Sequence, residues 1–413
     1  MKRPHVLAFT SLFRTPNERV RAPFTSEFLR ALGEFAELSL VCPIPWAPDV
    51  AAIRGRPEWA KFLNVPSRTS VDGVDVHYVR YPLLPRVSGV IQPWLEAQAA
   101  RAAVRAIHAR KPVDLVNGRF VFPDGVAAAS IARSLRVPLI LTALGTDINV
   151  YAQQRFKRGQ TQRALLQAAH VTAVSPALAD KMRDMGVQPQ HLSAAVNGID
   201  IDRFCPQGES VLRQRCGLVA DRKVLVSLAR LSSEKGLNVL LDAIGLIKRR
   251  GACDFTTVLI GDGPERDALE QQSRALGIAD IVHFAGEIDH ASVPAWLRGA
   301  DAFCLPSFRE GTPNVVIEAL ASGVPVVSTD VGGTPLLLNP DNGRLVPPHQ
   351  AAPLAEAISE VMRGHWSVEK IRASVSHMSW RSEAQRMMNI IETILLQPAR
   401  ADGLDVKLSG PRP

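Results

Sequence analysis

The chain has 413 residues, more than a single hydrophobic core ordinarily supports, so two domains of about 200 residues each are expected. Hydrophobic residues make up 46% and charged residues 21% of it, which is typical of a soluble globular protein and excludes a disordered or fibrous one. No apolar run approaches the roughly 20 residues that cross a bilayer, and we interpret the first apolar segment as a strand rather than a signal peptide. The five cysteines include no Cys-x-x-Cys pair, which favours reduced thiols in a cytoplasmic protein over disulfides or a zinc site.

The net charge of +8 is unevenly distributed along the chain. Residues 1–200 contain 25 Lys and Arg against 15 Asp and Glu, whereas the remainder contains 23 against 25. A basic first half suits an anionic partner such as the inner face of the cytoplasmic membrane or a lipid-linked pyrophosphate, and a solvated Arg-rich surface explains it equally well. Nucleic acid is disfavoured, because the charge is dispersed and only three Tyr are present to stack on bases.

Strand-like apolar runs alternate with amphipathic helical stretches throughout, which is the pattern of parallel α/β sheets. In the first half, strands are expected at 5–10, 37–43, 74–80, 114–118, 138–144 and 170–175, with helices at 24–35 and 93–110. In the second half, strands are expected at 223–230, 255–263, 281–286, 302–307 and 324–329, with helices at 237–250 and 266–277.

A turn-rich segment, residues 194–206, separates the two series and marks the expected hinge. The expected domains are therefore 1–197 and 198–379. A final amphipathic helix is expected at 380–396, followed by a frayed tail at 397–413.

Two stretches rich in Pro, Trp and Arg, residues 43–66 and 81–95, fit neither pattern. Long, irregular and apolar loops of this kind often hold a substrate or touch a membrane. A packed structural excursion explains them equally well.

Residues 309–333 place two carboxylates, Glu310 and Glu318, around a turn that follows a predicted strand. With about 1.5 Å of rise per helical residue, the two acids are expected on the order of 10 Å apart. That is too far for them to share a proton as a glycosidase pair does at roughly 5 Å. We therefore interpret each carboxylate as an acceptor for one vicinal diol of an extended ligand such as a sugar nucleotide.

The turn between the two acids is expected to bind the negative charge of that ligand. Thr312 suits the N-cap of the following helix, and Pro313 suits its first position, where a missing N–H costs nothing. Gly311 lets a ligand approach the backbone closely. The backbone N–H groups around Gly311, Asn314 and Val315 are expected to point at one anion, such as a pyrophosphate.

Cations for the same pyrophosphate are expected in the loop after the strand at 223–230. Arg230 and Lys235 lie beside Gly236 at the carboxyl end of that strand, where open parallel sheets bind ligands. Arg offers a fork of donors and Lys a point charge. Either cation alone is explained as a solvated side chain, but together with the acidic loop they predict a diphosphate site.

Two further strand ends are candidates. Gly261, Asp262 and Gly263 form a tight turn that we expect to line the nucleotide base pocket. The third glycine of a dinucleotide fingerprint is absent, which disfavours a nicotinamide cofactor. Asp147 follows the strand at 138–144, where it either contacts the transferred sugar or acceptor or caps the next segment.

These segments resemble the retaining family 4 glycosyltransferases, also called group 1, which have the GT-B fold. The similar pieces run in family order over about residues 170–350, and the segment from Glu310 to Glu318 is the most specific of them. The first half resembles the family more thinly, through residues 123–149. The sequence of this segment is similar to that of members involved in capsule, teichuronic acid and other surface polysaccharide synthesis.

The resemblance implies two Rossmann-like domains whose parallel sheets face a central cleft, with the last helix crossing back onto the first domain. The second domain would bind a nucleotide-diphosphate sugar, and the first a glycan or lipid-linked acceptor. Arg230 and Lys235 would hold the diphosphate. Glu310 would contact the donor sugar and stabilise charge at the reacting carbon, and Glu318 would contact the ribose. Transfer would retain the anomeric configuration with no obligatory metal and no other cofactor.

Three positions depart from the family pattern. Leu144 stands in the region where many members have a histidine that reaches the sugar 6-hydroxyl. Ala22 and Pro23 replace a glycine loop near the donor phosphate, and Leu336 stands where a glutamate is common. These departures motivate two hypotheses, an unusual donor such as a 6-deoxy sugar and a reduced activity.

The leading interpretation is a glycosyltransferase of surface polysaccharide synthesis. A non-catalytic sugar-nucleotide-binding or assembly subunit is the alternative, which the departures favour and the complete set of acids and cations opposes. A sugar-nucleotide epimerase of the same fold is a third hypothesis.

Overall fold

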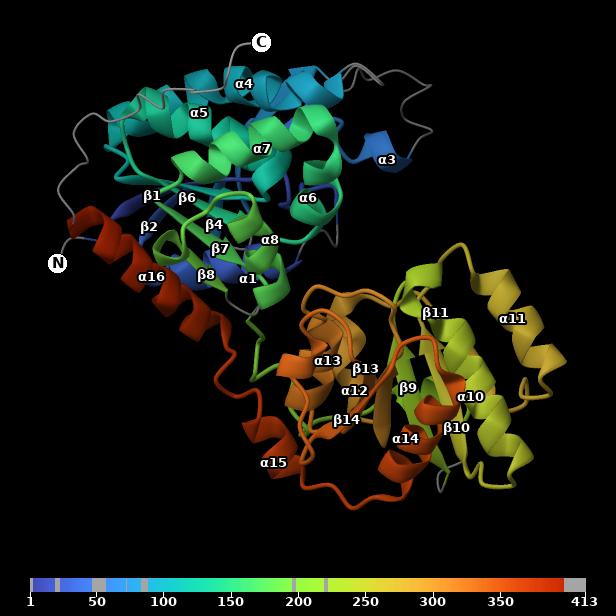
Figure 1. Ribbon diagram of the computed structural model, residues 1–413. Helices are drawn as coiled ribbons and strands as arrows, with labels where there is room; N and C mark the ends of the chain where they lie inside the picture. The colour runs from blue at the N-terminus through green and yellow to red at the C-terminus, as the bar shows by residue number, and fades with distance from the viewer. Residues whose placement is uncertain are drawn as a thin grey trace, which may run out of the picture.

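The computed structural model describes residues 3–18, 23–46, 57–71, 73–82, 88–194, 198–218 and 222–396. Within these ranges the chain forms two α/β domains, each with one central sheet covered by helices (Figure 1). The predicted tail, residues 397–413, lies outside the described residues. No helix in the described part of the chain combines the length and the apolar character that a membrane span requires.

The first domain is built on an eight-stranded sheet with strand order β3-β4-β2-β1-β5-β6-β7-β8. β3 pairs antiparallel with β4, and the other neighbours are parallel. All the predicted strands are present, and β3 and β8 are additional. The bounds are β1 (His5–Phe9), β2 (Glu37–Trp46), β3 (Arg68–Val71), β4 (Val74–Pro82), β5 (Leu115–Arg119), β6 (Leu139–Ala143), β7 (His170–Ala173) and β8 (Leu192–Ala194).

Helices cover both faces of this sheet. α4, α5, α7 and α8 pack on one face, and α1 packs on the other together with the last helix, α16. The central strands are buried on both sides, which is why they appear in the sequence as unbroken apolar runs. The bounds are α1 (Pro23–Leu32), α3 (Pro57–Ala60), α4 (Ser88–Arg110), α5 (Val126–Leu135), α6 (Thr146–Asn149), α7 (Arg155–Gln167) and α8 (Pro176–Asp184).

The second domain has a parallel six-stranded sheet with order β11-β10-β9-β12-β13-β14. Its two faces carry separate apolar cores. β14 is additional to the predicted strands. The strands are β9 (Lys223–Leu228), β10 (Phe255–Ile260), β11 (Val282–Gly286), β12 (Ala302–Leu305), β13 (Val326–Thr329) and β14 (Gly343–Val346). The helices are α9 (Leu212–Cys216), α10 (Leu237–Arg249), α11 (Arg266–Ala275), α12 (Val293–Leu297), α13 (Asn314–Ala321), α14 (Ala351–Arg363) and α15 (Val368–Ala373).

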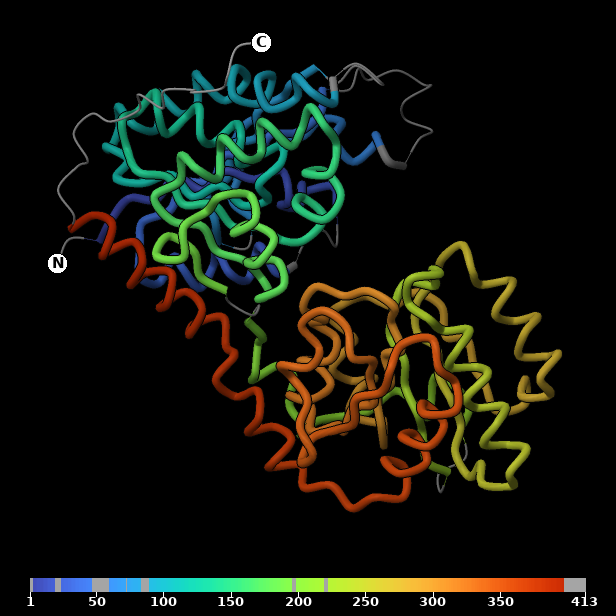
Figure 2. Tube along the Cα trace, viewed as in Figure 1, coloured from blue at the N-terminus to red at the C-terminus, as the bar shows by residue number. Residues whose placement is uncertain are grey.

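Two segments connect the domains, and Figure 2 shows them side by side. The backbone N–H of Ile199 donates to the carbonyl of Met378 at 2.7 Å, and Ile199 forms a parallel bridge with Ser379. Gly198 must be small, because a Cβ there would lie 2.7 Å from the Cα of Trp380. α16 (Trp380–Leu396) then packs against α1 in the core of the first domain, which confirms the predicted return of the last helix.

Candidate active site

The acidic loop lies between β12 and α13, at the carboxyl end of a central strand. Oε1 of Glu310 accepts a hydrogen bond from the hydroxyl of Ser307 at 2.6 Å and from Nζ of Lys235 at 2.7 Å. The Glu310 side chain is 10% exposed and that of Lys235 is 23% exposed. The ion pair is therefore partly sheltered from water, where its electrostatic interaction is stronger than on an open surface.

Lys235 comes from the loop between β9 and α10, and glycine is what lets this loop approach the acidic one. Gly236 has a left-handed φ of +63°, and a Cβ there would lie 2.2 Å from the carbonyl oxygen of Pro306. The N–H of Phe308 donates to the carbonyl of Glu234 at 2.8 Å. The structure thus confirms that the two loops predicted to share a ligand meet.

The Gly261–Gly263 turn supports the cation loop from behind. A Cβ at Gly261 would lie 2.0 Å from the carbonyl oxygen of Ala229, and one at Gly263 would lie 2.3 Å from that of Leu231. The N–H of Leu231 donates to the carbonyl of Asp262 at 3.0 Å. These glycines are therefore required for backbone packing, and a contact of this turn with a nucleotide base stays a prediction.

Arg230 lies at the outer edge of the same loop. Its side chain is exposed, and no ion pair joins it to another residue in the described part of the chain. Its guanidinium is free to turn toward a ligand. The diphosphate role of Arg230 stays a prediction.

The start of α13 differs from the prediction. The helix begins at Asn314 and not at Pro313, and Pro313 occupies the N-cap position without a side-chain hydrogen bond. Thr312 is not the N-cap, because its hydroxyl donates to the backbone carbonyl of Val174 in the first domain. The threonine thus connects the two domains. Helix geometry still leaves the first N–H groups of α13 without intrahelical partners, so an anion at Val315 and its neighbours stays a prediction.

Gly311 faces open space, since a Cβ there would have no heavy atom within 4 Å. Its carbonyl accepts the N–H of Gly333 at 2.6 Å. A Cβ at Gly332 would lie 2.2 Å from the carbonyl oxygen of Glu310. The two glycines after β13 therefore hold the acidic loop from the side opposite to Lys235.

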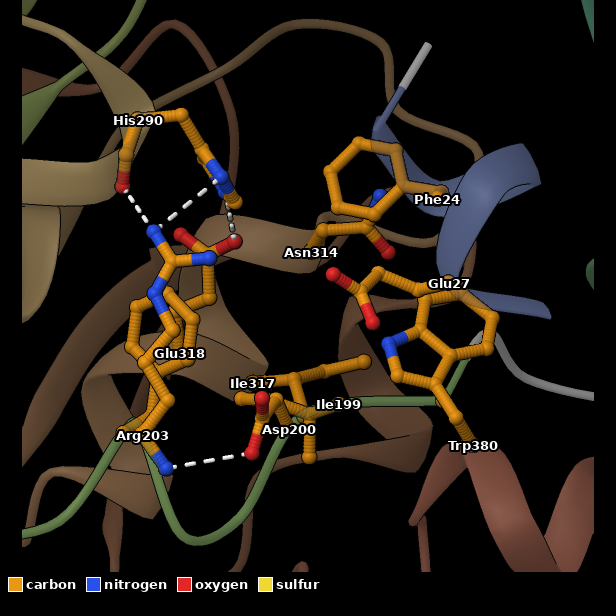
Figure 3. A pocket seen from close by; sticks show the side chains of 12 residues that line it. Phe24, Glu27, Ile199, Asp200, Arg203, His290, Asn314, Ile317, Glu318 and Trp380 are labelled. Atoms are coloured by element: carbon orange, nitrogen blue, oxygen red, sulfur yellow. Dashed lines mark hydrogen bonds and ion pairs between the residues drawn. The ribbon is translucent and has the colours of Figure 1, made fainter. Parts of the chain in front are cut away.

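Glu318 lies inside α13 and lines a pocket that Figure 3 shows. Its side chain is 4% exposed, and Oε1 lies 3.1 Å from Nε2 of His290. Arg203 in turn donates from Nη2 to the carbonyl of His290. Neither His290 nor Arg203 was among the predicted site residues, because each lies in a loop with no repeating pattern. The position of His290 just after β11 was the only available signal.

The opposite wall of the pocket comes from the first domain and the crossing segment. Phe24 and Glu27 of α1 and Trp380 of α16 line it (Figure 3). The rings of Phe24 and His290 meet edge to face with centroids 6.0 Å apart. The pocket beside Glu318 is therefore an interdomain cleft, and Phe24, Glu27 and Trp380 were not among the predicted site residues.

Asp147 does not lie in the cleft, which corrects its predicted contact with the sugar or acceptor. Its carboxylate is completely buried and accepts backbone N–H groups of Val121 at 2.7 Å, Gly145 at 2.8 Å, Ile148 at 3.1 Å and Leu144 at 3.2 Å. Burial raises the pKa of this carboxyl, and the four hydrogen bonds oppose that rise. Asp147 therefore caps and orders the chain around α6, which was the second alternative predicted from the sequence.

The three positions that depart from the family pattern have different surroundings. Leu144 is partly buried against the core of the first domain, and Leu336 is exposed. Pro23 begins α1, whereas Ala22 lies outside the described residues.

Comparison with known proteins places these features in a family. The family model described as "Glycosyltransferase Family 4" matches residues 13–203, and the model described as "Glycosyl transferases group 1" matches residues 222–363. The chain is 31% identical over 364 residues to TuaC of Bacillus subtilis, a glycosyltransferase named for teichuronic acid biosynthesis, with 86% of this chain and 88% of TuaC covered. It is 31% identical over 255 residues to WcaL of Escherichia coli, named for colanic acid biosynthesis, with 57% and 59% covered.

Solved structures share the fold. Sucrose-phosphate synthase from Thermosynechococcus elongatus superposes with a TM-score of 0.72 at 19% identity, covering 95% of this chain and 99% of that one. Anabaena HepE in complex with UDP gives a TM-score of 0.63 at 22% identity, covering 95% and 97%.

Two Rossmann-like domains that direct strand ends and charged loops into a shared cleft are the arrangement of the GT-B fold. Both halves match models of one family, and a relative above 30% identity spans most of the chain. The chain belongs to the group 1, family 4 glycosyltransferases.

Proposed function

We propose that this enzyme transfers a sugar from a nucleotide-diphosphate sugar to a glycan or lipid-linked acceptor, with retention of the anomeric configuration. The main support is the contact between Lys235 and Glu310, because it brings a cation and a carboxylate from two different strand ends to one point. A cation there suits the diphosphate and a carboxylate suits the sugar hydroxyls. HepE, which shares the fold, was solved with UDP.

The bonds that form and break in the proposed reaction belong to the donor and the acceptor alone. The acceptor hydroxyl oxygen forms a bond to the anomeric carbon while the bond from that carbon to the diphosphate oxygen breaks. The hydroxyl proton passes to the departing diphosphate on the same face of the sugar. Lys235 and Arg230 stabilise the negative charge that develops on the diphosphate, and Glu310 stabilises positive charge at the anomeric carbon.

The nucleoside end of the donor is proposed to lie in the pocket beside Glu318. A buried carboxylate held by His290 has a second oxygen available for the ribose hydroxyls. The pocket walls contributed by α1 and α16 would then exclude water from the bound nucleotide.

A panel of nucleoside diphosphates and their sugars tests the donor assignment. We expect one nucleoside diphosphate to raise the Tm of the purified protein in a saturable way, because a ligand that binds the folded state stabilises it. We expect the corresponding sugar nucleotide to be turned over, with NMR showing retained configuration in the product. Preference for a 6-deoxy sugar would support the hypothesis based on Leu144, and clear preference for a 6-hydroxylated hexose would contradict it. Binding without turnover of any donor would support a non-catalytic subunit.

We further propose that the product belongs to a cell-surface polysaccharide. TuaC and WcaL, named for teichuronic and colanic acid biosynthesis, support this. A lipid-linked acceptor would hold the growing glycan at a membrane, so an attachment of the enzyme to the inner face of the cytoplasmic membrane is part of the proposal.

A surface of the first domain supports this attachment. Exposed apolar side chains gather where α4 and α7 begin, and the two helices are joined there by a 3.0 Å hydrogen bond from Gln160 Nε2 to the carbonyl of Val90. Exposed basic side chains lie among them. We name these residues the α4–α7 patch: Val90, Ile91, Trp94, Arg155, Phe156 and Arg158. Trp94 is 62% and Phe156 72% exposed, which is unusual for residues of this size.

Apolar side chains interspersed with arginines suit an anionic bilayer, because the rings enter the interface and the guanidinium groups contact the headgroups. We expect Trp94→Ser combined with Phe156→Ser to reduce cosedimentation with vesicles of anionic phosphatidylglycerol at least tenfold. Val368→Ser, on exposed α15 of the second domain, is the matched control and should not change it. Equal cosedimentation of all three proteins would refute the patch as the attachment surface.

A further inference from the structure

A second cavity lies in the first domain, between α1, α16 and the carboxyl ends of β5, β6 and β7. We name it the Arg119 cavity. Its polar side chains are Arg119, Thr142, Thr172 and Glu383. Neither the donor site nor the mechanism proposed above uses them.

The defining feature of the cavity is a buried guanidinium without a hydrogen-bond partner. Arg119 ends β5 and is 4% exposed, and its guanidinium lies 4.0 Å from the centre of the Phe28 ring. Nε is completely enclosed, and no hydrogen bond joins the guanidinium to any residue in the ranges that the structure describes. Buried charged groups are ordinarily paired, because losing water without gaining a partner is unfavourable. The carboxyl of Glu383 interacts with Arg119 electrostatically but accepts no hydrogen bond from it, so the N–H donors of the guanidinium are left for a partner from outside the chain.

The neighbouring groups are suited to the same partner. The hydroxyl of Thr172 donates to that of Thr142 at 2.9 Å, which leaves the hydrogen of the Thr142 hydroxyl for another acceptor. Glu383 lies on the α16 side of the cavity and is bound from the other direction by Arg386 at 3.0 Å. Burial raises the pKa of Glu383 to about 7, so near neutral pH this carboxyl can also carry a proton to donate.

The cavity lies next to the reaction site. The backbone carbonyl of Val174, at the end of β7, lines the region and accepts the hydroxyl of Thr312 from the acidic loop. Trp380 lines both this cavity and the pocket beside Glu318. A molecule that reached Arg119 from the cleft would therefore extend away from the donor, on the side of the first domain.

We propose that the Arg119 cavity binds an oxyanion of the acceptor, a carboxylate or a phosphate, through the guanidinium of Arg119 and the hydroxyl of Thr142. This rests on the proposed transferase function and specifies the acceptor as an acidic one. A planar guanidinium binds either oxyanion through two parallel hydrogen bonds. The carboxylate would come from a uronic acid of the glycan, and the phosphate from the lipid carrier.

The test measures binding of small oxyanions to the full-length protein by isothermal titration calorimetry. The probes are glucuronate, methyl phosphate and neutral glucose, each added in the presence of a saturating nucleoside diphosphate so that the loop of Lys235 is already occupied. We expect one oxyanion to bind and glucose not to bind. Tighter binding of glucuronate would identify a uronic acid as the source, and tighter binding of methyl phosphate would identify the carrier.

Arg119→Met keeps an unbranched apolar side chain and removes the guanidinium, and we expect it to weaken oxyanion binding at least tenfold. Arg381→Met, at an exposed position of α16 where the side chain pairs with Glu34 at 2.8 Å, should leave the affinity within twofold. Absence of binding by both oxyanions, or binding that persists in Arg119→Met, would overturn the proposal. Failure of the proposed function is separable, because it would show as absent nucleoside diphosphate binding or absent donor turnover in the unaltered protein.

Discussion

Lys235→Ala should lower kcat/KM for sugar transfer by about 10²–10³, equivalent to about 3–4 kcal/mol of lost transition-state stabilisation. Lys235 is the one cation seen in contact with Glu310 within the described residues, at 2.7 Å. Removing it leaves the departing diphosphate without a sheltered counter-charge. Steady-state kinetics with the donor selected by the panel measures this effect.

The fold should survive this substitution. Glu310 keeps its 2.6 Å hydrogen bond from Ser307, so we expect the free energy of unfolding to fall by no more than about 1–2 kcal/mol. Lys248→Ala is the matched control, because Lys248 is paired with Asp280 at 2.6 Å on the far side of the same domain. Normal transfer by Lys235→Ala, or equal losses in the two variants, would rule out the assigned role.

The sequence predicted the central strands and the pairing of the two charged loops, for identifiable physical reasons. Central parallel strands are buried on both faces and appear as apolar runs, whereas β3, β8 and β14, three of the edge strands, are short and include accessible side chains. Lys235 and Glu310 follow neighbouring strands of one sheet, β9 and β12, and strand ends of a parallel sheet share an edge. The meeting of these two loops therefore follows from the fold class, because neighbouring parallel strands bring their following loops to the same edge.

Contacts that depend on side-chain direction were not predictable in the same way. Asp147 lies at a strand end like a ligand-binding residue, but its four backbone donors come from chain geometry that the sequence does not display. Thr312 has the spacing of an N-cap, yet its hydroxyl binds a carbonyl of the other domain. His290 pairs with Glu318 across 28 positions of sequence. Each of these depends on how separate elements pack, which composition and periodicity do not determine.

The buried carboxyl of Glu383 should make the stability of this protein fall as the pH rises toward neutrality. Burial raises its pKa to about 7 in the folded protein, from an ordinary value of 4.5, and Arg386 and Arg119 oppose that rise. At pH values between these two pKa values, the Glu383 carboxyl is therefore protonated in the folded state and ionised in the unfolded state. The stability contributed by the protonated carboxyl is fully present below pH 4.5, declines as the pH rises through this window, and is lost above pH 7.

Glu383→Gln removes this titration while keeping the size of the side chain. One unit of pKa corresponds to about 1.4 kcal/mol. As the pH rises from 4.5 to 8, the free energy of unfolding of the variant should therefore increase by on the order of 3 kcal/mol relative to that of the unaltered protein. Urea unfolding at a series of pH values measures the difference. Asn389→Ala, at an exposed position of the same helix, changes no titratable group and should show a constant difference from the unaltered protein. Parallel pH profiles for Glu383→Gln and the unaltered protein would contradict the raised pKa and mean that the carboxyl is ionised over this pH range. The cavity would then hold a permanent anion opposite Arg119. An oxyanion of the acceptor would have less reason to bind there.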